Sequence, residues 1–241
     1  MWALAPGLSA ARLAAWAQQQ APRAVLVVSP HWMTHGSVSV MTTPQPETWH
    51  DFGGFPDPLY RLQYPAPGAP ELGAQAVALL RAAGWSVQAD AQRPFDHGAW
   101  VPLRHMWPQA DIPVTQVSLP QGASPQQLMA MGQALAPLRD EGVLLLCTGS
   151  MTHNLRQRDQ GDLSYVPVFA RWVRERVMAG DRAALLDWAQ QAPHAQQAHP
   201  SDEHFLPLFI AWGAAGADER VAWLNDEIQF GYLAMDSVAW H

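Results

Sequence analysis

Four histidines stand at positions where a folded chain could assemble a catalytic site. His31 and His153 each follow an apolar run that has the character of a strand. His97 precedes a glycine in a loop, and His204 precedes an apolar stretch. Two or three neutral imidazoles with open coordination positions form a centre that suits zinc or iron. Spacing alone leaves open whether the four rings converge, and the alternative is that each histidine is only a hydrogen-bonded loop residue.

The apolar run at residues 24–28 predicts a strand buried on both faces, because it is short and rich in valine. Pro30 predicts the end of this strand, since proline cannot donate a hydrogen bond to a sheet ladder. His31 then lies just beyond a strand end, which is where open α/β sheets bind their ligands. The run at residues 143–147 places His153 in a similar position, while His204 is expected in the first turn of a helix capped by Ser201 or Asp202.

Strands alternate with helices along the rest of the chain. Further strands are predicted at 37–42, 86–89, 114–119 and in the tail 227–240, and helices at 9–20, 71–83, 125–138, 166–178 and 181–191. This order predicts one α/β domain over residues 1–241, with a mostly parallel or mixed central sheet flanked by helices. The long segment 43–70 is rich in proline and aromatic residues, so it is either a lid or pocket wall or an irregular packing segment.

Composition excludes several classes of protein. The net charge is −7 without a basic patch, which argues against nucleic-acid binding. The sequence contains no lysine, so a pyridoxal-phosphate site and a Walker-type phosphate loop are excluded. Cys147 is the single cysteine, so a metal would have to be held by imidazole and carboxylate. No apolar run is long enough to span a membrane and no leader precedes the first helix, so we expect a cytoplasmic protein.

Six short motifs occur together in a fixed order. They are Ser-Pro-His-Trp at 29–32, His-Asp-Phe-Gly-Gly-Phe-Pro at 50–56, Tyr-Pro-Ala-Pro-Gly at 64–68, Phe-Asp-His-Gly-Ala-Trp at 95–100, Thr-His-Asn-Leu at 152–155 and Glu-His-Phe-Leu-Pro-Leu at 203–208. In this combination the chain resembles the class III extradiol ring-cleavage dioxygenases, in particular the 4,5-DOPA dioxygenase branch. The resemblance extends over essentially the whole chain.

The resemblance implies a role for each of the four histidines. His31 and His204 match metal ligands, and His153 matches the catalytic acid/base, which is sometimes also a ligand to zinc. His97 matches a pocket histidine that helps to position oxygen and the substrate. The implied metal is one divalent ion, Fe²⁺ or Zn²⁺, and the implied substrates are a catechol and O₂, with ring opening to a semialdehyde. Zinc would fit the same imidazoles but has no redox chemistry.

Several neighbouring residues are weaker candidates. Trp32 and Trp100 flank site histidines and are candidates for the substrate-binding face, with core packing as the alternative. Asp96, Asp202 and Glu203 are candidates for orienting the imidazole rings through their second nitrogen.

Arg93, Arg156 and Arg158 are candidates for pairing with a substrate carboxylate, with surface solvation as the alternative. The sequence leaves the oligomeric state open and allows a homo-oligomer.

One part of the family pattern falls outside this sequence. The family begins with a strand that ends in His-Gly-Ser-Pro-Met, and that histidine is a metal ligand. Here Met1 matches the final methionine, so either the natural start lies upstream, which we favour, or the protein lacks this ligand. We expect a gap in the sheet beside the strand at 24–29, and a metal content below one ion per chain.

Three other functions compete with the dioxygenase. A serine hydrolase would use Ser150, but the flanking residues lack the Gly-x-Ser-x-Gly pattern of a nucleophile elbow. A zinc-dependent hydrolase would use the same histidines. A homologue deficient in its metal site would act only as a binding module.

Overall fold

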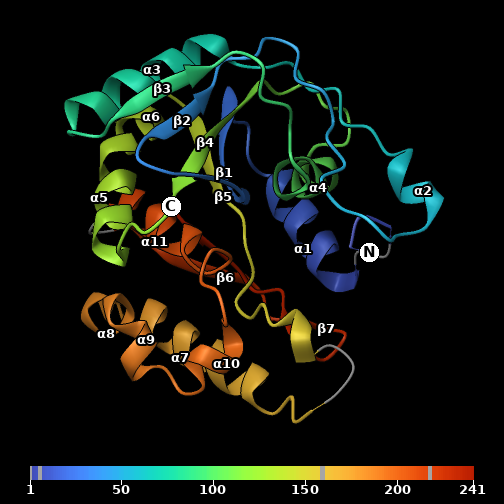
Figure 1. Ribbon diagram of the computed structural model, residues 1–241, viewed down its shortest axis with the longest axis vertical. Helices are drawn as coiled ribbons and strands as arrows, with labels where there is room; N and C mark the ends of the chain where they lie inside the picture. The colour runs from blue at the N-terminus through green and yellow to red at the C-terminus, as the bar shows by residue number, and fades with distance from the viewer. Residues whose placement is uncertain (1, 5–6, 158–160, 217–218) are drawn as a thin grey trace.

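A five-stranded sheet forms the centre of the computed structural model, which describes residues 2–4, 7–157, 161–216 and 219–241 (Figure 1). The strands lie in the order β3-β2-β4-β1-β5. Their bounds are Ala24–Thr34 (β1), Val38–Met41 (β2), Val87–Asp90 (β3), Val114–Pro120 (β4) and Val143–Cys147 (β5). Two small antiparallel pairs follow, formed by Val221–Asn225 (β6) with Ser237–Trp240 (β9) and by Ile228–Gln229 (β7) with Leu233–Ala234 (β8).

The strand directions bring three strand ends to one edge of the sheet. β1 runs parallel to both β4 and β5, so the carboxyl ends of these three strands lie together. β2 runs antiparallel to β4 and parallel to β3. The prediction of an α/β fold with a mixed sheet is therefore confirmed, and the common edge of β1, β4 and β5 is the expected place for a ligand.

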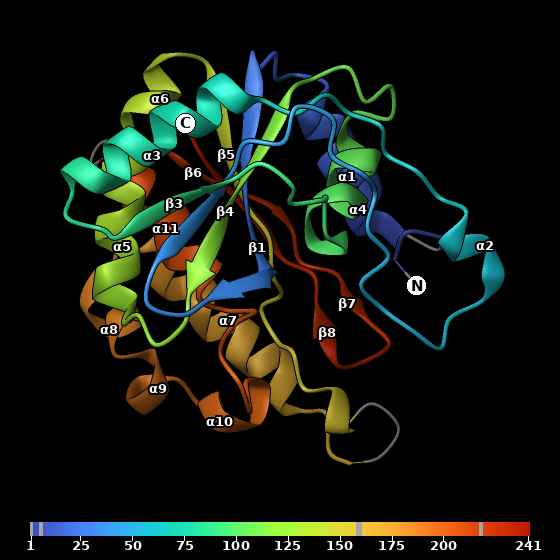
Figure 2. The ribbon, with the colours of Figure 1, turned by 45° about the horizontal axis from the view of Figure 1, so that its top comes forward.

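Helices cover both faces of the sheet. Figure 2 shows α3, α5 and α11 on one face and α1 and α4 on the other, while α7 to α10 lie beyond the carboxyl ends of the strands. The helices are Gly7–Ala17 (α1), Asp57–Tyr60 (α2), Pro70–Ala82 (α3), His97–Met106 (α4), Pro125–Leu135 (α5), Pro137–Asp140 (α6), Tyr165–Met178 (α7), Arg182–Leu186 (α8), Trp188–Gln191 (α9), Ala195–Ala198 (α10) and Pro207–Ala214 (α11). None of the helices within the described ranges is long and apolar enough to cross a membrane.

Alternate residues of β1 enter two separate cores. Leu26 and Val28 pack on the face covered by α11, whereas Val25 and Val27 pack with Trp100 on the face covered by α4. All five side chains are fully buried. Each such burial contributes roughly 1.5–3 kcal/mol, so the strand that carries His31 is firmly anchored on both sides.

The structure corrects the prediction that Pro30 ends this strand. β1 continues to Thr34, and its register with β4 shifts between Val28 and Met33. Proline lies inside that irregular stretch, where no regular ladder bond is required of it. The expected gap beside this strand is also wrong, because β1 has β4 on one side and β5 on the other.

Two predicted helices and the position of His204 also differ in detail. The helix predicted at 125–138 divides at Pro137 into α5 and α6, and the helix at 181–191 divides into α8 and α9. His204 lies in a turn before α11 and not in a first helical turn, because α11 begins at Pro207. Proline suits the first helical position, where its missing N–H is not needed.

Candidate metal centre at the strand ends

The four histidines predicted from the sequence converge at the carboxyl ends of β1 and β5. The rings of His31 and His97 have centroids 3.8 Å apart, and those of His31 and His204 are 5.1 Å apart. His153 stacks on His204 at 3.4 Å with an interplanar angle of 11°. The rings therefore form one continuous row in the order His97, His31, His204, His153.

Two glycines permit this close approach. A Cβ on Gly98 would collide with the hydroxyl of Ser29 and would press on the ring of His31. A Cβ on Gly149 would collide with the backbone oxygen of His204. Glycine at these two positions therefore lets α4 and the segment after β5 lie directly against the histidine row.

Each of two histidines is held by a carboxylate. The Oδ1 atom of Asp51 lies 2.9 Å from Nδ1 of His97 and accepts a hydrogen bond from its backbone N–H at 2.9 Å. Glu203 Oε1 lies 3.0 Å from Nδ1 of His204. When Nδ1 donates to a carboxylate, Nε2 keeps its lone pair and can bind a metal or accept a proton.

The pKa values of these carboxylates reflect their partners. Burial would raise the pKa of Asp51, but its hydrogen bonds with His97 outweigh burial and hold the pKa below its usual value. The hydrogen bond with His204 is the largest cause that lowers the pKa of Glu203 to about 2. Both groups are therefore anionic at neutral pH, which strengthens the hydrogen bonds that they accept from imidazole N–H groups.

Two imidazoles of the row, His31 and His153, have pKa values that leave them neutral at neutral pH. Burial, with the neighbouring His97 and His204, lowers the pKa of His31 to about 4. Burial and the nearby His204 lower the pKa of His153 to about 3. A neutral imidazole offers a lone pair, and a metal ligand or a general base must have one available.

A buried polar network supports the irregular part of β1. Asp96 is fully buried and accepts hydrogen bonds from Ser29 Oγ at 2.7 Å, Gln116 Nε2 at 2.9 Å and Arg93 at 3.0 Å. The guanidinium of Arg93 also lies 4.6 Å from the ring centroid of Trp32. Arg93 is thus occupied within the protein, so the structure gives no support for its pairing with a substrate.

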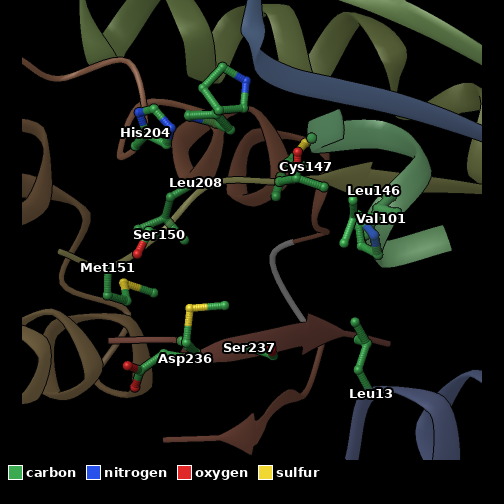
Figure 3. A pocket seen from close by; sticks show the side chains of 18 of the residues that line it. Leu13, Val101, Leu146, Cys147, Ser150, Met151, His204, Leu208, Asp236 and Ser237 are labelled. Atoms are coloured by element: carbon green, nitrogen blue, oxygen red, sulfur yellow. The ribbon is translucent and has the colours of Figure 1, made fainter. Parts of the chain in front are cut away.

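A cavity of about 450 Å³ opens onto the histidine row, and Figure 3 shows His204 at its border. All four histidines line it. Phe52, Phe55 and Leu59 form part of its wall, so the segment 43–70 supplies a pocket wall. Trp32 and Trp100, predicted to face the substrate, are instead buried in the core and do not line the cavity.

The donor set fits a divalent metal ion. Two groups bring their ligand atoms within 4.8 Å of one another: His31 with Asp51 and His97, and His153 with Glu203 and His204. Imidazole and carboxylate are the ligands of non-haem iron and of catalytic zinc. The four histidines and the two carboxylates therefore supply candidate ligands for such an ion.

The structure offers no support for a serine nucleophile at Ser150. Its hydroxyl donates to the backbone oxygen of Thr152 at 2.8 Å and contacts that of Ala234 at 3.3 Å. A nucleophilic serine would instead be hydrogen-bonded to a base.

Asp51 is the site residue that the sequence did not single out. It lies within the motif at 50–56, which gave a signal for the segment but not for this carboxylate. Of the acidic candidates, Glu203 orients a ring as expected, whereas Asp96 holds Ser29 and Arg93.

The fold and the histidine row define an α/β protein with a candidate metal centre at the carboxyl ends of its strands. The chain belongs to the family described as "Catalytic LigB subunit of aromatic ring-opening dioxygenase", which matches residues 8–235. It is therefore a member of the extradiol dioxygenases in their 4,5-DOPA dioxygenase branch, as its motifs predicted.

Individual relatives agree with this assignment. The chain is 39% identical to "4,5-DOPA dioxygenase extradiol" of Beta vulgaris, over 90% of this chain and 82% of the relative. It is also 39% identical to the protein of the same name from Escherichia coli K12, with the same two coverages. A crystal structure of an uncharacterized protein from Escherichia coli K12 superposes with a TM-score of 0.78 at 30% identity, and the match covers 94% of this chain and 89% of that one.

Proposed function

We propose that this protein is a metal-dependent extradiol dioxygenase that opens a DOPA-like catechol ring with O₂ to give a semialdehyde. The observation that carries the proposal is the continuous row of four imidazoles, with a carboxylate on Nδ1 of two of them. The catechol is proposed because several relatives are named for 4,5-DOPA.

We propose that His31, His204 and His153 hold one divalent ion. At neutral pH the lowered pKa values of His31 and His153 leave their lone pairs available for binding. Glu203 fixes the ring of His204 and increases its basicity as a ligand. When bound, ferrous iron would provide a site for both catechol oxygens and the redox chemistry needed for the reaction with O₂.

The remaining residues orient the substrate and move protons. A neutral His153 can accept a proton from a catechol hydroxyl, as a general base, and return it later in the reaction. His97 has its Nδ1 atom held by Asp51 and its ring beside that of His31, and it is proposed to position the reactants. Phe52 and Phe55 provide an aromatic wall against which a planar catechol ring can lie.

The test is oxygen consumption with L-DOPA or catechol as the added substrate. The metal-free protein is loaded with Fe²⁺ or with Zn²⁺, and oxygen uptake is recorded together with the absorbance of a semialdehyde product. Catechol-dependent uptake with iron supports the proposal. Absence of uptake by folded protein that has been shown to hold iron would overturn it, and hydrolysis of ester or amide substrates with zinc would favour a hydrolase.

A further inference from the structure

His31 lies in the part of β1 where the pairing of the sheet is interrupted. β4 pairs with residues 25–28 and 33–34 of β1, and β5 pairs with residues 24–28. Pro30, within the interruption, has no backbone N–H to donate. The ladders therefore fix the strand before and after His31, and the backbone of His31 itself relies on contacts with side chains.

Two side chains hold the backbone of His31. Its N–H donates to the hydroxyl of Ser29 at 3.2 Å, and its carbonyl oxygen accepts from the guanidinium of Arg93 at 3.4 Å. Both partners bind the same carboxylate, since Ser29 donates to Oδ1 of Asp96 at 2.7 Å and Arg93 donates to its Oδ2 at 3.0 Å. Ser29 and Asp96 are fully buried, so water does not compete for the bond between them.

The same carboxylate fixes the helix that carries His97. Asp96 is the N-cap of α4, and its Oδ1 atom accepts a hydrogen bond from the backbone N–H of Ala99 at 3.2 Å. One oxygen therefore joins the first turn of α4, through Ser29, to the backbone of His31. The two segments that meet at this oxygen carry the two rings whose centroids lie 3.8 Å apart.

We propose that Ser29 is a positioning residue, whose hydroxyl holds the backbone of His31 against α4 and so fixes the direction from which the His31 ring binds a metal ion. The inference rests on the proposed function, in which His31 is a metal ligand. Ser29 does not line the cavity, so it acts through His31 and not on the substrate. A hydroxyl suits this position because it accepts one hydrogen bond while it donates another.

The first measurement uses the metal-free protein. In Ser29→Ala the N–H of His31 loses its acceptor, and the hydroxyl no longer joins the two segments. The nuclear Overhauser effect between the ring protons of His31 and His97 reports how closely the two rings are held. We expect this effect to weaken in Ser29→Ala, because the backbone of His31 is then free to shift relative to α4.

The second measurement is the affinity for Zn²⁺, obtained by competition with a chromogenic chelator. We expect Ser29→Ala to bind Zn²⁺ about tenfold more weakly, at the lower end of the effect of residues that support metal ligands. Ser29→Thr keeps the hydroxyl and should lie closer to the wild type than Ser29→Ala. If Ser29→Ala does not fold, Ser29→Cys takes its place, because a thiol keeps the volume but accepts hydrogen bonds only weakly.

Ser118 provides a matched control in the same sheet. Its buried hydroxyl also joins a backbone N–H to a side chain, since it lies 2.8 Å from the backbone nitrogen of Ser39 and 2.7 Å from the hydroxyl of Thr34. Ser118→Ala should lower the midpoint of urea unfolding about as much as Ser29→Ala does. It should leave the Overhauser effect between the two rings and the affinity for Zn²⁺ unchanged.

The proposal is overturned if either readout keeps its wild-type value in the folded Ser29 variant, or if Ser118→Ala changes both readouts equally. It is also overturned if Ser29→Thr binds Zn²⁺ no better than Ser29→Ala. Neither readout requires catalysis. A protein that shows the expected losses but consumes no oxygen when loaded with iron would therefore refute the proposed dioxygenase and leave the role of Ser29 supported.

Discussion

A single oxygen atom of Asp51 fixes both the backbone and the ring of His97. Asp51 Oδ1 lies 2.9 Å from the His97 backbone nitrogen and 2.9 Å from its Nδ1 atom. The Asp51 side chain is only 8% exposed, so water competes weakly for these bonds. The ring of Phe52 packs against the same imidazole with an interplanar angle of 87°. His97 is therefore held on two sides in one orientation.

Replacing Asp51 should impair the reaction without unfolding the protein. We expect Asp51→Ala to lower kcat by about 10–100-fold, because partners of this kind typically contribute that much to activity. Asp51→Asn keeps an acceptor oxygen, so its kcat should fall less than that of Asp51→Ala. Steady-state kinetics with L-DOPA measures both variants, and wild-type kcat in folded Asp51→Ala would show that the orientation of His97 is unimportant.

Glu203 should control metal affinity through His204. Loss of the carboxylate in Glu203→Ala frees the His204 ring and should weaken metal binding by about 10–100-fold. Glu203→Gln retains an oxygen acceptor, so its metal affinity should lie between that of the wild type and that of Glu203→Ala. The measurement is a competition titration with a chromogenic chelator, and Glu71→Ala, on the exposed side of α3, is the control. Equal metal affinity in the wild type and in the three variants would show that Glu203 does not influence metal binding.

The buried Arg93–Asp96 pair should be important for stability. Asp96→Ala leaves the Arg93 guanidinium buried without its counter-charge, which should lower the free energy of unfolding by about 3–5 kcal/mol. The exposed pair between Arg23 and Glu141 is a matched control, and Glu141→Ala should cost less than about 1 kcal/mol. Urea unfolding gives both values, and a similar small loss in the two variants would contradict the prediction.

His199 should make the metal-free protein less stable in acid. Burial lowers the pKa of His199 to about 4, whereas a histidine in the unfolded chain has its ordinary pKa of 6.5. Between these values the unfolded state binds the proton that the folded state excludes, so stability should fall as pH falls, by up to about 1.4 kcal/mol per pH unit.

The variant His199→Gln provides the test of this pH dependence. Glutamine retains a donor for the backbone oxygen of Met151, which lies 2.8 Å from His199 Nε2, but it does not titrate. The loss of stability between pH 6.5 and 4 should be smaller in the variant, and not absent, because His31 and His153 act with the same sign. An unchanged pH dependence would show that His199 does not contribute.

Local sequence predicted the strands and the placement of the histidines well. β5 matches its predicted bounds because a short apolar run between polar segments indicates clearly where a buried strand begins and ends. His31 and His153 lie near strand ends as expected, since strand ends in an α/β sheet are determined by the strands themselves.

Long-range contacts account for what the sequence did not predict. Asp51 and His97 are separated by 46 positions, so no local pattern relates them. Arg93 resembled a free cation in the sequence, and its neutralisation by Asp96 depends on burial of both groups. Pro30 lies inside β1 because the ladder is locally irregular, which depends on the neighbouring strand.

The most direct test of the central claim is the mass of the product formed from L-DOPA under ¹⁸O₂. The iron-loaded protein is used, and the aldehyde is reduced at once with borohydride so that it cannot exchange oxygen with water. Extradiol dioxygenation predicts a ring-opened product in which both atoms of ¹⁸O₂ are incorporated. An intact ring, or a product labelled only from water, would contradict the account.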